Sequence, residues 1–219
     1  MYIWPETEGS RGSQEISACL KCHITLNTNT AKHIITYSDS CTGQNRNIKT
    51  VLSMMKIIQS PQIRADIIDM KFLVSGHSYL PNDTDFALIE KKARRTVNIY
   101  SPRDWYDILL EFKKKNKYSL TEMKREDFLS IKSLEEAVVN RKKTLNGDSV
   151  NWLEMRWIRL EKQEPLKIKF KLALCEEMDF EVIDLQKKQV ERPILSLDSI
   201  LQDVLYPSVR PVTVAKRGI

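Results

Sequence analysis

Asp39, His77 and Glu90 follow or lie within predicted strands and helices that could bring them together. Carboxylate and imidazole side chains of this kind suit the binding of a divalent metal ion. Asp39 and His77 each follow a short apolar run, and Glu90 lies seven residues after Asp83, two helical turns along the same face. Carboxylate oxygens are the ligands that Mg²⁺ prefers. A bound Mg²⁺ or Mn²⁺ would polarise a phosphodiester and activate water. The pattern predicts Asp39 and Glu90 as metal ligands and His77 as a group that positions a ligand or phosphate.

Each of these residues also has an ordinary structural interpretation, which the sequence leaves open. An aspartate between a strand and a glycine bend, such as Asp39, often forms an Asx turn. A lone histidine such as His77 is commonly a hydrogen-bonded structural residue. Asp83 fits a helix N-cap, and Glu90 fits a surface ion pair with Arg94. Only the topology that these residues share favours a common site.

Strands and helices are predicted to alternate in the first hundred residues, and this order determines where the polar residues lie. Hydrophobic spacing predicts strands over 2–4, 33–37 and 70–74, and helices from Ser13, over 48–58 and after Asp83. Alternation of this kind indicates a parallel sheet covered by helices. Ligands of such sheets bind beyond the carboxyl ends of the strands, which is where Asp39 and His77 would lie.

The second half of the chain has a different pattern. A helix is predicted after Pro102, and Asn146-Gly147-Asp148 is a clear turn signal. Beyond it, the segments 152–160, 166–174 and 180–185 alternate apolar and charged residues, which is typical of antiparallel strands with one solvated face. We therefore expect an α/β core over 1–100, a helical connector over 101–146, a small antiparallel β-sheet over 147–192 and an extended tail over 193–219.

Lysines alternate along one of these strands, and two interpretations of them stay open. Lys167, Lys169 and Lys171 point to one side, and Arg156 and Arg159 lie on the strand before. These cations could follow a phosphate backbone. They could equally protect a solvated sheet edge from pairing with another chain.

Composition sets wider limits on the class of protein. The 219 residues are 42% hydrophobic, which is enough for a packed core, and the formal net charge of +6 is compatible with a DNA partner. No run approaches the roughly 18 apolar residues of a membrane span. Four cysteines are too few for a disulfide scaffold, and the first residues lack a secretory signal pattern. The chain is expected in the nucleus or cytoplasm, away from membranes, and a homo-oligomer stays open.

One short motif suggests other cofactors. Cys19-Leu20-Lys21-Cys22-His23 has the spacing of a c-type haem attachment motif, and the same residues with Cys41 could bind zinc. The motif lies within an amphipathic helical pattern, where Cys19 and His23 share one face. No second closely spaced pair completes a zinc site. Cysteine as a small buried residue is the favoured interpretation.

Two longer motifs carry a family resemblance. The segments DSCTGQNRN (39–47) and GHSYLPNDTDFALIE (76–90) resemble an uncharacterised domain that is common in arthropod proteins derived from DNA transposons. The resemblance extends to NWLEMRWIRLEKQEP farther along. The core of that domain is similar to ribonuclease H-type transposases and integrases.

This resemblance implies an α/β, ribonuclease H-like mixed sheet with flanking helices, to which a small antiparallel β appendage would be added here. It also implies metal-dependent cleavage and transfer of DNA by an acidic triad that binds two divalent ions. Asp39 matches the second acid and Glu90 the third, with Asp85 as the reserve candidate, while His77 matches a histidine that precedes the last acid.

The chain departs from this pattern at its beginning. One strand precedes the first helix where the fold has three, and no aspartate precedes Asp39. The resemblance therefore implies a fragment or degenerate copy whose first acid is missing. Whether this chain is an enzyme stays open, and the alternative is a non-catalytic protein or nucleic-acid interaction module on the same scaffold.

Overall fold

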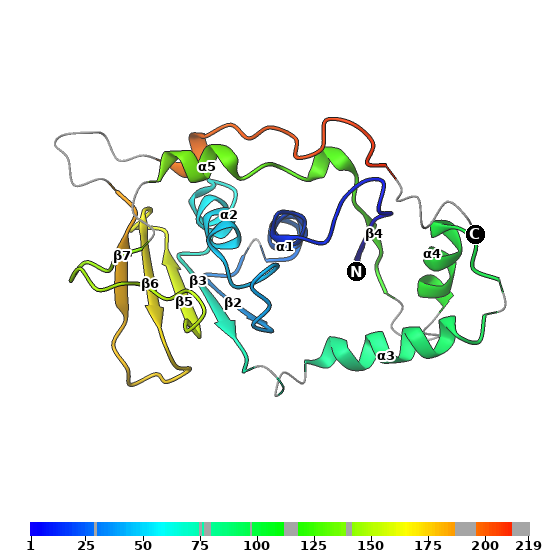
Figure 1. Ribbon diagram of the computed structural model, residues 1–219, viewed down its shortest axis with the longest axis horizontal. Coiled ribbons are helices and arrows are strands. Elements are labelled where there is room, and N and C mark those ends of the chain that lie inside the picture. Colours follow the sequence, from blue (N-terminus) through cyan, green and yellow to red (C-terminus); the bar gives the residue numbers. More distant parts are fainter. Residues whose placement is uncertain are drawn as a thin grey trace.

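The computed structural model shows a mixed α/β fold with one five-stranded sheet and flanking helices (Figure 1). It describes residues 1–28, 30–74, 76, 80–96, 98–111, 118–138, 142–186 and 196–211. The strands lie in the order β2 (His33–Ser38), β3 (Ile67–Phe72), β5 (Trp157–Glu161), β6 (Lys167–Lys171) and β7 (Glu181–Asp184). Within the described residues, no helix is long and apolar enough to cross a membrane.

The direction of the strands changes at β3. β2 and β3 are parallel, as expected, with Ile34 beside Ile68, whereas β5 runs antiparallel to β3 and begins a meander through β6 and β7. The antiparallel strands expected as an appendage therefore continue the main sheet. The first expected strand is the exception, because β1 (Tyr2–Ile3) pairs with β4 (Thr121–Glu122) in a separate two-stranded sheet.

Helix α2 (Ile48–Gln59) forms the centre of the hydrophobic core. Asn47 caps its first turn by accepting a hydrogen bond from Thr50 N at 3.0 Å, and Pro61 follows its end. Its apolar residues are almost completely buried against one face of the sheet, where they meet Ile68, Ile158, Leu160 and Ile168. Helix α1 (Ser13–Asn27) packs on α2 and buries Ile24 in the same core.

Helices α3 (Pro81–Ala93) and α4 (Pro102–Glu111) lie apart from this core (Figure 1). α3 contacts α4 and extends away from the end of β3. Ile89 and Ala93 are buried, whereas Phe86 is 56% exposed. The expectation that this helix would cover the sheet is not met, because its buried stripe is narrow and faces α4.

The C-terminal segment is held by the rest of the chain. The Lys56 ammonium group donates to the carbonyl oxygens of Leu197, Asp198 and Ile200 at 2.7–3.0 Å. Farther along, Leu205 N donates to Phe128 O at 2.7 Å, close to the short helix α5 (Lys132–Ala137). Within the expected tail, residues 196–211 are therefore hydrogen-bonded to α2 and to the segment before α5.

Asp69 is the one acidic side chain buried within the sheet itself. Its carboxylate, 1% exposed, accepts two hydrogen bonds from Arg159 and one from His33, each at 2.8 Å. Burial alone would raise the pKa of Asp69, but the hydrogen bonds from Arg159 and His33 lower it below the ordinary value of 3.8. The stabilisation by the ionised carboxylate is therefore present above about pH 4 and is lost as the pH falls through the lowered pKa.

Removing Arg159 alone should strongly destabilise the fold. Arg159→Leu leaves the Asp69 carboxylate buried with only His33 as partner, and we expect the free energy of unfolding in urea at pH 7.5 to fall by about 3 kcal/mol. The double variant Asp69→Leu/Arg159→Leu should recover most of that loss, since it removes both charges. A double variant less stable than Arg159→Leu would show that the pair is not the cause.

Candidate functional site

Asp39 lies at the carboxyl end of β2, on the exposed edge of the parallel pair. Its Oδ1 accepts hydrogen bonds from Cys41 N at 3.1 Å and from Asn45 Nδ2 at 2.7 Å. The Asx turn considered as the structural alternative is therefore present. Both hydrogen bonds end on Oδ1, so within the described residues Oδ2 has no hydrogen-bond partner and the exposed side chain offers it to solvent.

Two acidic residues of α3, Glu90 and Asp83, have partners at the two ends of that helix. Glu90 pairs with Arg94 at 2.7 Å, and both side chains are more than 60% exposed. The N-cap residue of α3 is Leu80, three positions before Asp83, so the prediction of Asp83 as the N-cap is wrong. The Asp83 carboxylate instead accepts a hydrogen bond from the Leu80 backbone N–H at 2.9 Å. Among the described residues, no hydrogen bond or ion pair joins Asp39 to Glu90.

Asp85 and His77 are the two other candidate site residues. Asp85 lies in the amino-terminal half of α3, the half that follows β3 more closely in the chain. His77 lies outside the described residues. Across the described ranges, no group of three or more histidine, cysteine or acidic side chains is arranged to hold a metal ion. Asp39 alone does not fit a two-metal centre, but its free oxygen fits one ion that completes its coordination with water and phosphate.

Two arginines meet near Asp39, and sequence reasoning missed their combination. Arg46 is 8% exposed, and its Nη1 donates to Met155 O at 3.4 Å. Its Nε is buried without a hydrogen-bond partner. Arg156 donates from Nη1 to Ser40 Oγ at 2.9 Å. Within the part of the chain that is described, neither guanidinium has a carboxylate partner; burial, and then the charge of Arg156, lower the pKa of Arg46.

Strand pairing explains how residues so far apart in sequence come together. Arg156 directly precedes β5, and its carbonyl oxygen accepts from Phe72 N, the last residue of β3, at 2.8 Å. Ser40 follows β2, and its hydroxyl donates to Leu73 O at 2.6 Å. Arg46 directly precedes Asn47, the N-cap of α2. The carboxyl ends of β2 and β3, the start of β5 and the start of α2 thus meet at one edge of the sheet.

The lysines of β6 all have partners within the protein. Lys169 pairs with Glu161 at 2.9 Å and with Glu164 at 2.6 Å, and Lys167 pairs with Glu164 at 2.7 Å. These hydrogen bonds lower the pKa of Glu164 to about 2. The third lysine, Lys171, donates to the backbone carbonyl oxygens of Cys175 and Glu176. A free ladder along a phosphate backbone is not supported, nor is edge protection, because β6 lies between β5 and β7.

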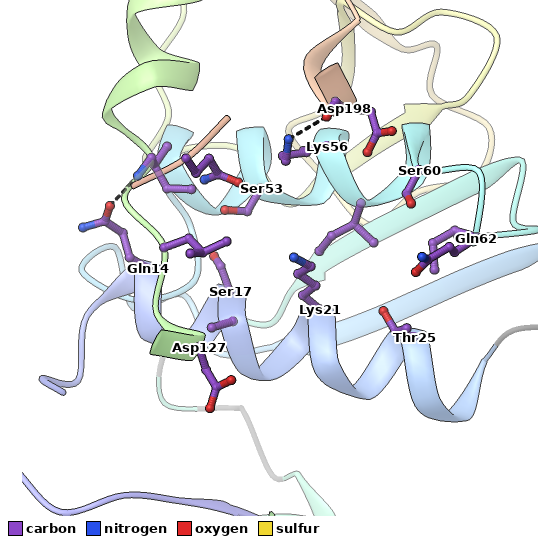
Figure 2. Close-up of a pocket in the computed structure, with 16 residues that line it drawn as sticks. Gln14, Ser17, Lys21, Thr25, Ser53, Lys56, Ser60, Gln62, Asp127 and Asp198 are labelled. Carbon is purple, nitrogen blue, oxygen red and sulfur yellow. Dashed lines mark hydrogen bonds between the residues drawn. The ribbon is translucent and has the colours of Figure 1, made fainter. Parts of the chain in front are cut away.

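A cavity of about 230 Å³ lies between α1 and α2 (Figure 2). Hydroxyl and amide groups line it, together with two lysines and two aspartates (Lys21, Lys56, Asp127 and Asp198). The formal charges of these four residues cancel. Lys56 uses its ammonium group to hold the C-terminal segment. The cavity therefore shows no preference for an ionic ligand.

The cysteine motif does not form a cofactor site in the described structure. Cys19, Cys22 and His23 lie in α1, and the described residues contain no cluster that would complete a zinc site. Burial raises the pKa of Cys19 to about 12. A thiol with this pKa is a poor nucleophile at neutral pH, which fits the interpretation of Cys19 as a packed residue.

Comparisons of the chain with protein-family models, with curated proteins and with solved structures find no match.

The three hydrogen bonds of Lys56 should make a measurable contribution to stability. Lys56→Met leaves three carbonyl groups without their donor, and we expect the free energy of unfolding to fall by about 2 kcal/mol in urea denaturation. Lys21→Met is the matched control, because Lys21 lines the same cavity without a described partner; its effect should be within about 0.5 kcal/mol. Equal effects of the two substitutions would contradict this role of Lys56.

The cysteines should differ in reactivity in the order of their exposure. At pH 8, iodoacetamide should modify the exposed Cys41 first, and Cys19 at least about tenfold more slowly, because its thiolate is disfavoured by burial. Peptide mass spectrometry over time would measure both rates. Cys41→Ser should abolish the fast phase and Cys19→Ser should preserve it; faster labelling of Cys19 would overturn the assignment.

Proposed function

We propose that the chain is a nucleic-acid-processing domain that contacts phosphodiester groups at the carboxyl edge of β2 and β3. Asp39 is the ligand of a divalent ion, Mg²⁺ or Mn²⁺, and DNA is the partner. The observation that carries this proposal is the exposed Oδ2 of Asp39, which is offered to solvent at the end of a parallel strand pair. Ligands of α/β sheets bind at this kind of edge.

The donor set favours an ion that is shared with the nucleic acid. Mg²⁺ is commonly held by one or two carboxylates together with substrate phosphates and retained waters. When bound, such an ion neutralises phosphate charge and polarises the phosphodiester. Asp39 is prepared for this role, because the amide groups of Cys41 and Asn45 fix its carboxylate through the other oxygen.

A transposon-derived, ribonuclease H-like origin is the finer part of the proposal. The mixed five-stranded sheet with flanking helices supports it, as do the motifs around Asp39 and His77. β5, β6 and β7 continue the sheet beside β3 as antiparallel strands, so the sheet reaches five strands although only one strand precedes the first helix.

A non-catalytic nucleic-acid interaction module is the second candidate. The geometry of α3 favours it, because Glu90 is paired with Arg94 on a helix that extends away from the sheet. With one acid at the strand edge, the domain would bind nucleic acid through a metal ion without cleaving it. Asp85 is then the residue that separates the two candidates, since a cleaving enzyme needs a second carboxylate from this helix.

Magnesium should stabilise the protein through Asp39. At 10 mM Mg²⁺ with a short DNA duplex present, we expect the melting temperature of the wild type to rise by about 2–4 °C, as for a ligand near ten times its Kd. Asp39→Asn should lose this rise. The matched control Asp66→Asn, at the opposite end of the sheet, should keep it; an equal rise in wild type and Asp39→Asn would overturn the proposal.

A cleavage assay with end-labelled DNA distinguishes the two candidates. Product in the wild type that is lost in Asp39→Asn and Asp85→Asn supports strand cleavage. A magnesium response without product supports the interaction module.

A further inference from the structure

We propose that Arg46 and Arg156 form a binding site for one phosphate group of a nucleic-acid strand. This inference rests on the function proposed above and adds to it the protein groups that would hold the backbone. It comes from charge and burial at the strand edge, and it requires neither Asp39 nor a metal ion.

The burial of Arg46 is the first observation. An arginine that is 92% buried normally has a carboxylate partner, because removing a charge from water without one is costly. Here one carbonyl oxygen, that of Met155, accepts from Nη1 at a long 3.4 Å, and Nε has no partner. Nε is enclosed by protein, so the donors left for an anion are those of the two Nη atoms, of which only Nη1 has a hydrogen-bond partner among the described residues. The planar guanidinium fits two phosphate oxygens at once.

The second observation is that another cation lies beside the first. Arg46 Nη1 donates to the carbonyl oxygen of Met155, the residue directly before Arg156, and the charge of Arg156 contributes to lowering the pKa of Arg46. The two guanidinium groups therefore repel each other in the free protein. Arg156 is fixed by a hydrogen bond to Ser40 and, among the described residues, is not neutralised by any carboxylate. An anion between the two groups would turn this repulsion into attraction to a shared charge.

The surrounding backbone adds to the positive potential. Arg46 is the residue directly before the N-cap of α2, a helix of 12 residues, whose amino-terminal end carries a partial positive charge. The nearby carboxylate of Asp39 is held by Cys41 and Asn45 rather than by either arginine. An ion at Asp39 and a phosphate at the arginines would therefore engage one strand without competing for the same protein groups.

Other cationic surfaces lack this combination. On the outer face of the sheet, Lys167 and Lys169 are paired with Glu161 and Glu164, and Arg159 is paired with Asp69. The cavity between α1 and α2 is lined by equal numbers of positive and negative side chains. Among these surfaces of the described residues, the edge beside α2 is the one that combines burial, two cations and an unsatisfied donor.

Fluorescence anisotropy with a labelled single-stranded DNA, in EDTA so that no metal contributes, tests this site. Arg46→Gln and Arg156→Gln should each weaken binding by about tenfold and reduce the slope of log K against log salt by about 1. Arg64→Gln is the matched control, because Arg64 is an exposed arginine before β3, and it should bind within about twofold of the wild type. Arg46→Lys keeps the charge but loses the paired N–H donors of the guanidinium, so its DNA affinity should lie between those of Arg46→Gln and the wild type.

Folding and the source of the phosphate are controlled separately. Each variant is compared by its melting temperature; if Arg46→Gln fails to fold, Arg156→Gln, which alters a half-buried side chain, carries the test alone. Inorganic phosphate at 10 mM should compete with DNA in the wild type and not in Arg156→Gln. Stabilisation by phosphate with unchanged DNA affinity in the arginine variants would assign a free-phosphate site and overturn the nucleic-acid inference.

The two proposals fail in different ways. DNA binding in EDTA that is unaffected by Arg46→Gln and Arg156→Gln overturns the arginine site, whatever magnesium does at Asp39. Loss of binding in these variants, together with a magnesium response that is the same in Asp39→Asn, supports the arginine site and removes the metal proposal.

Discussion

The position of β3 between a parallel and an antiparallel neighbour is the constraint on which the rest of the structure depends. β2 pairs with it in parallel, so the carboxyl ends of both strands meet, and β5 pairs with it in the opposite direction, so β5 begins where β3 ends. Asp39, Ser40 and Arg156 consequently share one edge. Reversing β5 would move Arg156 to the other end of the sheet and leave the edge without its second cation.

Helix α2 makes this edge rigid. Its buried residues fix it against β3 and β5, and the capped start at Asn47 fixes the loop that connects β2 to it. Arg46 has little freedom, since it lies between that loop and the core. A buried, unpaired guanidinium is tolerated here because the helix packing that encloses it is far more favourable than its desolvation is costly. A locally unfavourable arrangement of this kind is typical of sites that bind a ligand.

Hydrophobic spacing predicted helices and strands well where residues close together in the sequence determine them. The spacing of Val51, Leu52, Met55 and Ile58 predicted α2, and β-branched runs predicted β2 and β3. The orientation of α3 could not be predicted, because its weak apolar stripe gives no sign that it packs on α4 rather than on the sheet. The expected convergence of Asp39 and Glu90 required that packing, and the structure does not provide it.

The site depends on long-range pairing, which explains why sequence reasoning misjudged its cations. The lysines of β6 look like a phosphate-binding ladder only until the turn at 162–166 places Glu164 between Lys167 and Lys169. Arg156 belongs to the same cationic run, yet its place before β5 removes it from those acids and brings it to Arg46. A net charge of +6 does not identify a binding surface, because several of the cations, Lys167, Lys169 and Arg159 among them, are paired with acids. The positive electrostatic potential is strongest where strand pairing brings together cations without carboxylate partners. Among the described residues, that place is the edge beside α2.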